Sequence, residues 1–329
     1  MSLKRERVKA ALVGEQVDQP PISVWRHFYE LEMSGEGLAQ AMLAFQRQYD
    51  WAFMKVNPRA QYHVEDWGAT FQYTGDAYTP PTTTHVPISS PEEWHGLNRL
   101  DPHQGTLVEH LRALRAIRNG LKREVPFVMT VFNPISLAGR LVESQDVMLQ
   151  HLREHPKEVH AALEVITESY RAFVTECLNE GADGIFFATT AWATYDVLTD
   201  EEYQEFGRPY DLRVLEAAKD AEFNILHVCR SNNMLQALAD YPAIHALNWD
   251  ARDTTNPSLE SARKLTNRPL IGGVSRETLL NGTPEAVAQE VRDAIAQTGG
   301  RGFMVGPGCS ISPRCPEENL RALQEAVRA

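Results

Sequence analysis

The sequence predicts an α/β protein in which residues 1–329 form a single (β/α)8 TIM-barrel domain. Eight short apolar segments with strand character alternate with segments of helical spacing, a pattern typical of a parallel sheet. No shift in composition marks a linker, and the length suits one barrel with insertions. An open, doubly wound sheet is the alternative, although it would usually divide a chain of this length.

The first half of the chain is expected to supply four strands and an insertion. Residues 3–13 carry apolar side chains at helical spacing and predict a helix that ends at Gly14. The stretch 61–87 is rich in Thr, Tyr and Trp with Gly75-Asp76 as a turn, so we expect an inserted β-hairpin after the second strand. The strands are expected at 22–25, 52–56, 126–132 and 184–188, and the helices at 37–48, 106–121 and 156–179.

The second half repeats the alternation. Thr199 with Glu202 three residues later predicts a helix start with a capping box. The remaining strands are expected at 225–229, 246–249, 269–271 and 302–305, and the remaining helices at 234–239, 284–297 and 317–327.

Composition excludes some classes of partner. The formal net charge is −12 and no Lys/Arg-rich run is present, which argues against nucleic acid. The charged N-terminal stretch is unlike a signal peptide, and no run approaches the roughly 18 apolar residues of a membrane span. Four cysteines do not make a disulfide framework. We therefore expect a cytoplasmic protein without a membrane partner.

A candidate metal site lies on the expected fifth strand. His227 and Cys229 are two residues apart, so on a strand their side chains point to the same face. Cys309 follows the last expected strand in the loop 306–309. One imidazole and two thiols are suitable ligands for zinc with one open position. The alternative is a hydrogen-bonded core histidine beside two small buried hydrophobic side chains.

Other polar residues follow the expected strands, where the active site of a barrel lies. Cys177 falls inside a long helix and is expected in the core, while Cys315 lies beyond the last strand and is a weaker ligand candidate than Cys309. The remaining residues at strand ends are Arg26, His27, Asn57, Asn133, Thr189, Asp250 and Gly273.

Two further segments each have a functional and a structural interpretation. The glycine-rich loops 272–273 and 306–308 could bind a phosphate, or could let the backbone turn closely beside a site. The acidic and aromatic stretch 62–67 could donate a carboxylate or stack a planar ligand, or its aromatic residues could pack within a hairpin.

The chain resembles the uroporphyrinogen decarboxylase superfamily over nearly its full length. The motifs that carry the resemblance are Asp66-Trp67-Gly68, the sequence Gly-Thr-Pro-Glu at 282–285 and the ending at 306–320. The superfamily contains metal-free decarboxylases of a tetrapyrrole. It also contains methylcobamide-dependent methyltransferases, which bind zinc through His-x-Cys and a distant Cys.

The decarboxylase pattern is poorly matched. Arg26 lacks the second arginine four residues later, where this chain has Glu30. The positions at which decarboxylases carry Asp, Tyr, Ser and His align by eye with Phe53 or Met54, Arg140, Thr189 and Pro307.

The methyltransferase pattern is matched by His227, Cys229 and Cys309, in the same order and at similar separation. The resemblance implies that these catalytic residues hold Zn²⁺, which activates a small thiol substrate as a thiolate. The thiolate would attack a methyl group on a corrinoid, carried by a partner protein docked over the barrel mouth. A second copy of this chain, forming a homodimer, is a further candidate partner.

Their positions near the expected barrel mouth suggest roles for further residues. Asp250 is the candidate to orient His227. Residues expected to bind the substrate or the corrinoid tail are Arg26, His27, Asn57, Arg140, Thr189 and Asp250. Two alternatives stay open: a uroporphyrinogen decarboxylase or related carboxy-lyase, and a protein that binds zinc, a corrinoid or a tetrapyrrole without turnover.

Overall fold

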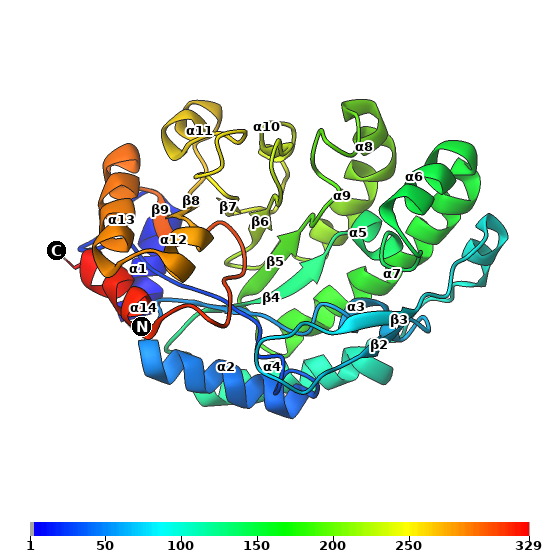
Figure 1. The fold of residues 1–329 in the computed structure, drawn as a ribbon, viewed down its shortest axis with the longest axis horizontal. Helices are drawn as coiled ribbons and strands as arrows, with labels where there is room; N and C mark the ends of the chain where they lie inside the picture. The colour runs from blue at the N-terminus through cyan, green and yellow to red at the C-terminus, as the bar shows by residue number, and fades with distance from the viewer. Residues whose placement is uncertain (1–2, 329) are drawn as a thin grey trace.

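Seven parallel strands form a curled sheet in the computed structural model, which describes residues 3–328. The order across the sheet is β1-β4-β5-β6-β7-β8-β9, and helices lie around its outside (Figure 1). The strands are β1 Met54–Val56, β4 Phe127–Phe132, β5 Gly184–Ala188, β6 Ile225–His227, β7 Ala246–Asn248, β8 Leu270–Val274 and β9 Phe303–Pro307.

The long helices lie where the sequence predicts them. They are α1 Leu3–Leu12, α2 Gly35–Tyr49, α3 Tyr62–Glu65, α4 Gly105–Leu121, α5 Pro134–Ala138, α6 Gln145–Glu154, α7 Pro156–Asn179, α8 Asp200–Phe206, α9 Arg208–Glu216, α10 Leu235–Leu238, α11 Leu259–Leu265, α12 Arg276–Asn281, α13 Pro284–Thr298 and α14 Glu317–Ala326, with a 3-10 turn at Pro91–Gly96. The capping box at Thr199 and Glu202 is confirmed. Helices α5, α6, α9, α11 and α12, most of them short, were not predicted from the sequence.

The strands are apolar because both faces of the sheet are buried, as is usual for parallel sheets. The outward face packs against the helices in a large hydrophobic cluster. The inward face forms a second, smaller cluster, and its side chains include Trp25, Phe53, Val128, Phe186, Ile225, Ile271 and Met304. This inner cluster supports the residues that follow the strand ends.

The predicted first strand does not form a regular ladder. Its residues make isolated bridges, Ile22 with Val305 and Arg26 with Ile311. The N–H of Ala52, just before β1, donates to the carbonyl of Ile22 at 2.9 Å. This segment therefore lies between β9 and the start of β1. Pro20 and Pro21 have no N–H to donate, so a ladder cannot extend toward the start of the segment.

The structure differs from the predicted hairpin at the beginning of the segment 61–87. Residues 62–65 form helix α3, and only β2 Thr70–Gln72 and β3 Thr82–His85 pair as an antiparallel ribbon. The carboxylate of Asp66 accepts from the N–H of Thr106 at 2.9 Å and so caps the start of α4. Tyr62, His63 and Val64 are buried in succession, which a helical turn allows and the alternation of a half-exposed hairpin strand does not.

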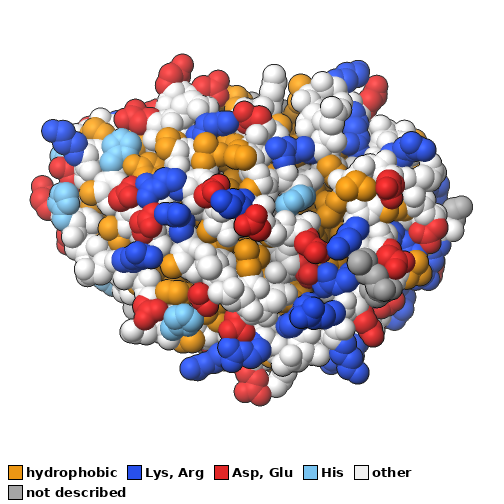
Figure 2. Space-filling view, turned by 180° about the vertical axis from the view of Figure 1, so that it is seen from behind, with side chains coloured by type: hydrophobic (Ala, Val, Ile, Leu, Met, Phe, Trp, Pro, Cys, Tyr) orange, Lys and Arg blue, Asp and Glu red, His pale blue; other side chains and the backbone are white. Residues whose placement is uncertain are grey.

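Among the described residues, no helix is both long enough and apolar enough to cross a membrane. Figure 2 shows one face of the molecule, where acidic and basic side chains are intermixed. This mixture agrees with the absence of a Lys/Arg-rich run in the sequence.

Candidate metal centre and cavity

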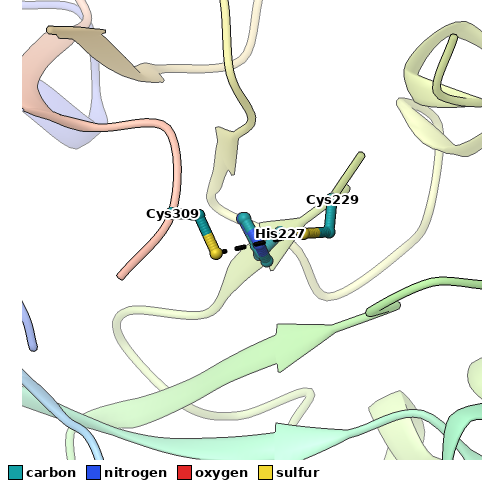
Figure 3. Close-up of side chains that lie close together, drawn as sticks. All are labelled: His227, Cys229 and Cys309. Carbon is teal, nitrogen blue, oxygen red and sulfur yellow. Dashed lines mark hydrogen bonds between the residues drawn. The ribbon is translucent and has the colours of Figure 1, made fainter. Parts of the chain in front are cut away.

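His227, Cys229 and Cys309 come together where β6 and β9 end. His227 is the last residue of β6, Cys229 lies two residues further on, and Cys309 follows β9. The ligand atoms of the three residues all lie within 4.8 Å of one another (Figure 3). Parallel strands bring their carboxyl ends to the same edge of the sheet, which is why residues far apart in sequence meet here.

The spacing of the two thiols fits a shared metal ion. Their sulfur atoms are 3.9 Å apart. Two thiolates bound at about 2.3 Å in a tetrahedral site lie about 3.8 Å apart, whereas a disulfide is about 2.05 Å long. Both cysteines are free. The donor set of one imidazole and two sulfurs is suitable for Zn²⁺ with a fourth position left for a substrate.

The imidazole of His227 is oriented by Asn248 on the neighbouring strand. Nδ1 of His227 lies 2.7 Å from Oδ1 of Asn248. The Asn248 amide nitrogen donates to the carbonyls of Ile271 at 3.0 Å and Pro307 at 3.1 Å, so its oxygen must face the imidazole. Nδ1 therefore carries the proton, and Nε2 is left with a lone pair for a metal.

The prediction that Asp250 orients His227 is wrong, because Asn248 takes that place. An Asp250 carboxylate oxygen accepts from the N–H of Arg252 at 3.2 Å instead. The ring of Phe186 also stacks on His227, with 5.1 Å between ring centroids.

The two thiols are electrostatically unequal. A hydrogen bond from Cys229 holds the pKa of Cys309 well below its usual range, and the nearby imidazole of His227 acts in the same direction. Burial opposes this shift. A site that favours a buried thiolate suits a cation, because thiolate is the form of cysteine that binds metal.

A cavity of about 850 Å³ opens over the three residues. Seven of the predicted site residues line it: His27, Asn57, Arg140, His227, Cys229, Asp250 and Cys309.

Arg26 and Thr189 are not among the residues that line this cavity. The Arg26 guanidinium lies over the ring of Phe28 at 4.8 Å and donates to the carbonyl of Pro313 at 2.9 Å. The Thr189 hydroxyl donates to the carbonyl of His227 at 3.3 Å. Both residues therefore support the site from outside the cavity, and neither position supports the predicted contact with a substrate.

Arg140 is a half-buried cavity residue whose charge is not compensated by a neighbouring side chain. Its guanidinium lies over the ring of Phe132, 5.0 Å from the centroid. Across residues 3–328, no hydrogen bond or ion pair to this guanidinium is found. Burial lowers the pKa of Arg140 to about 10, which leaves the side chain positive at neutral pH. An anionic group in the cavity would supply the missing acceptor.

Two residues at the site, Asn248 and Lys55, were not predicted from the sequence. Asn248 ends an apolar strand, and Lys55 lies inside another. A polar residue within a buried strand was the available signal for both, because buried polar side chains require partners.

The remaining candidates have structural roles. Carboxylates of the stretch 62–67 are engaged, since Glu65 pairs with Arg59 at 2.8 Å and Asp66 caps α4. A Cβ on Gly308 would lie 2.5 Å from Cα of Asp250, so this glycine permits close backbone packing. Cys177 is fully buried, and Cys315 is not part of the metal-competent group.

The family model for uroporphyrinogen decarboxylase (URO-D) matches residues 3–329. The methylcobamide:CoM methyltransferase MtbA of Methanosarcina acetivorans is 23% identical over 256 residues, covering 77% of this chain and 73% of that protein. The uroporphyrinogen decarboxylase of Serratia proteamaculans is 27% identical over 256 residues, covering 74% of this chain and 70% of that protein.

A solved structure supports the fold. A methyltransferase from Methanosarcina mazei superposes with a TM-score of 0.83 at 22% identity, covering 99% of this chain and 98% of that one. The match to the family model spans nearly every residue, including all three candidate ligands. The chain therefore belongs to the uroporphyrinogen decarboxylase (URO-D) family.

Proposed function

We propose that this protein is a zinc-dependent methyltransferase that moves a methyl group from a corrinoid to a thiol. The observation that carries the proposal is the group His227, Cys229 and Cys309, whose ligand atoms lie within 4.8 Å of one another. The similarity to methylcobamide:CoM methyltransferases adds support.

A bound zinc would lower the pKa of a thiol in its open position and hold it as the nucleophilic thiolate. The protein's own residues set up that position. Asn248 fixes the imidazole of His227, and the two cysteines approach from separate strand ends. In the transfer, the thiolate sulfur forms a bond to the methyl carbon while the carbon–cobalt bond breaks, and that electron pair stays on cobalt.

The cavity offers contacts for the rest of a substrate. Arg140 has a positive charge without an acceptor, so it is suited to a carboxylate or sulfonate at the far end of the thiol. His27 and Asn57 also line the cavity and add polar groups to it. The corrinoid would approach through the open mouth, most simply on a partner protein.

The decarboxylase alternative rests on the family itself and on the relative from Serratia proteamaculans. Two observations speak against it. Phe53, near the position aligned with the decarboxylase aspartate, is fully buried in the inner cluster. A metal-free reaction would also give no reason for three side chains that can bind a metal to lie together.

The test is a direct comparison of the two reactions. Zinc-loaded protein is mixed with methylcobalamin and 3-mercaptopropionate, and the methyl thioether is measured by mass spectrometry. The same preparation is assayed with uroporphyrinogen III for loss of carbon dioxide. We expect methyl transfer that requires zinc and is lost in Cys309→Ser. Decarboxylation without methyl transfer would overturn the proposal.

A further inference from the structure

Lys55 places a buried amine in the wall of the metal cavity. It is the middle residue of β1, and alternation along the strand points its side chain inward, as for Phe53 two residues earlier. Its side chain is only 4% exposed, yet it lines the cavity that contains His227 and both cysteines. Lysine is rarely buried to this extent without an ion-pair partner.

The contacts of Lys55 connect it to both segments that carry the candidate ligands. Nζ lies 4.8 Å from the centroid of the Phe186 ring, and the same ring stacks on His227. Nζ also donates a hydrogen bond to Oδ1 of Asn57. That oxygen accepts a second bond, at 3.1 Å, from the hydroxyl of Ser310, the residue after Cys309.

These contacts leave hydrogen-bond donors unused. Within residues 3–328, no carboxylate forms an ion pair with Lys55, and Asn57 is its one hydrogen-bond partner. An ammonium group has three donors. The amide nitrogen of Asn57 is likewise buried and lacks a partner in the described chain. An electron-rich atom in the cavity would satisfy both groups.

The charged and titratable groups around Lys55 are few. Glu32, Cys229 and Cys309 favour its protonated form, while the imidazole of His63 also lies within electrostatic range. Burial outweighs the three favourable groups and lowers the pKa of Lys55 to about 7. The amine therefore changes its charge near neutral pH, where a general base is most useful.

Building on the proposed thiol methyltransferase activity, we propose that Lys55 is the general base that takes the proton of the incoming thiol. The S–H bond breaks, its electron pair stays on sulfur, and the proton forms the fourth bond to Nζ of Lys55. After the methyl group has been transferred, the neutral thioether leaves and Nζ returns the proton to solvent.

Charge balance explains why a lysine is suited to this step. Two cysteine thiolates would neutralise a bound divalent cation, so an additional substrate thiolate would give the buried centre a net charge of −1. A net buried charge is costly unless it is paired. Transfer of the proton to Lys55 would create a neighbouring ammonium, whose charge balances that of the thiolate-bound centre. Asn57 acts as the positioning residue, because it holds Nζ and the Ser310 hydroxyl on one oxygen.

The experiment measures where the thiol proton goes, by titrating zinc-loaded protein with 3-mercaptopropionate in a calorimeter. Buffers of different ionisation enthalpy then give the number of protons released. At pH 6 Lys55 is already protonated, so about one proton per thiol should reach the buffer. At pH 8 the amine is mostly neutral and keeps the proton, so release should fall well below one proton per thiol.

Two variants serve as matched controls. Lys55→Met has no base, and Lys55→Arg has a charge that cannot accept a proton at these pH values, so each should release about one proton at both pH values. Zinc content and circular dichroism confirm that each variant is folded and loaded.

The outcomes separate the two proposals. Thiol binding with about one proton released at pH 8 by wild type would overturn the role of Lys55 and leave the methyltransferase intact. No zinc-dependent thiol binding by the wild type would overturn the proposed function itself.

Discussion

Oδ1 of Asn248 lies 2.7 Å from Nδ1 of His227, across the pair of neighbouring strands β6 and β7. The two residues are register partners in the parallel ladder, so the sheet itself sets their distance. The amide of Asn248 is held in turn by the carbonyls of Ile271 and Pro307. The candidate ligand is therefore oriented by backbone atoms of two further strands.

We predict that Asn248→Ala weakens zinc binding about 10- to 100-fold, because the imidazole of His227 loses its orienting acceptor. A competition titration with a chromophoric chelator measures the affinity. Asn248→Asp keeps an oxygen for Nδ1 and should recover part of the loss. Equal zinc affinity in wild type and Asn248→Ala would show that the hydrogen bond has no effect on the metal.

Cys309→Ser should reduce the metal content of the purified protein from about one zinc per chain to a small fraction, because a hydroxyl is a poor zinc ligand. Elemental analysis of protein purified without added zinc gives the number. Cys315→Ser is the matched control and should retain zinc, since Cys315 lies outside the metal-competent group. Loss of zinc in both variants would point to misfolding, and loss in neither would remove the metal site.

Arg140→Met should raise the KM for 3-mercaptopropionate about 10- to 100-fold, the effect of losing a charge-assisted hydrogen bond. The neutral thiol 2-mercaptoethanol has no anion for the guanidinium, so its KM should stay within about twofold of the wild-type value. Steady-state methyl transfer with the two thiols makes the comparison. The same change in KM for both thiols would contradict anion recognition by Arg140.

The buried carboxyl group of Asp211 should make stability depend on pH. It accepts hydrogen bonds from Tyr203 at 2.7 Å, Tyr241 at 2.9 Å and Asn133 at 3.1 Å. Burial nevertheless raises its pKa to about 7. Between pH 4 and pH 7 the folded state keeps a proton that the unfolded state has lost. This contribution, about 4 kcal/mol at most, is complete below pH 4 and disappears as the pH rises through 7.

Asp211→Asn removes this titration, so its free energy of unfolding should change less between pH 5 and pH 8 than that of the wild type. Urea denaturation at the two pH values measures the difference. Asp220→Asn changes an exposed carboxylate and is the control, expected to follow the wild type. An identical pH dependence in wild type and Asp211→Asn would show that Asp211 stays ionised.

The local pattern of residues predicted most of the alternation of strands and helices. Apolar runs such as 184–188 coincide with β5, and Thr199 with Glu202 forms the expected capping box. These signals are local, since they depend on side-chain burial and on hydrogen bonds within one turn. The predicted first strand failed because its partners are not local: β9, which lies at the other end of the chain, offers it only isolated bridges.

The sequence by itself identified His227, Cys229 and Cys309 as candidate metal ligands, from their chemistry and from their positions at the ends of expected strands. Only the tertiary structure decided that their ligand atoms meet, because the three residues come from two strand ends far apart in the sequence. The tertiary structure also decided the hydrogen-bond partner of His227. Strand register places Asn248, and not Asp250, beside its imidazole. The same holds for Lys55, whose place in the cavity wall depends on burial inside the curled sheet, a property that no sequence spacing specifies.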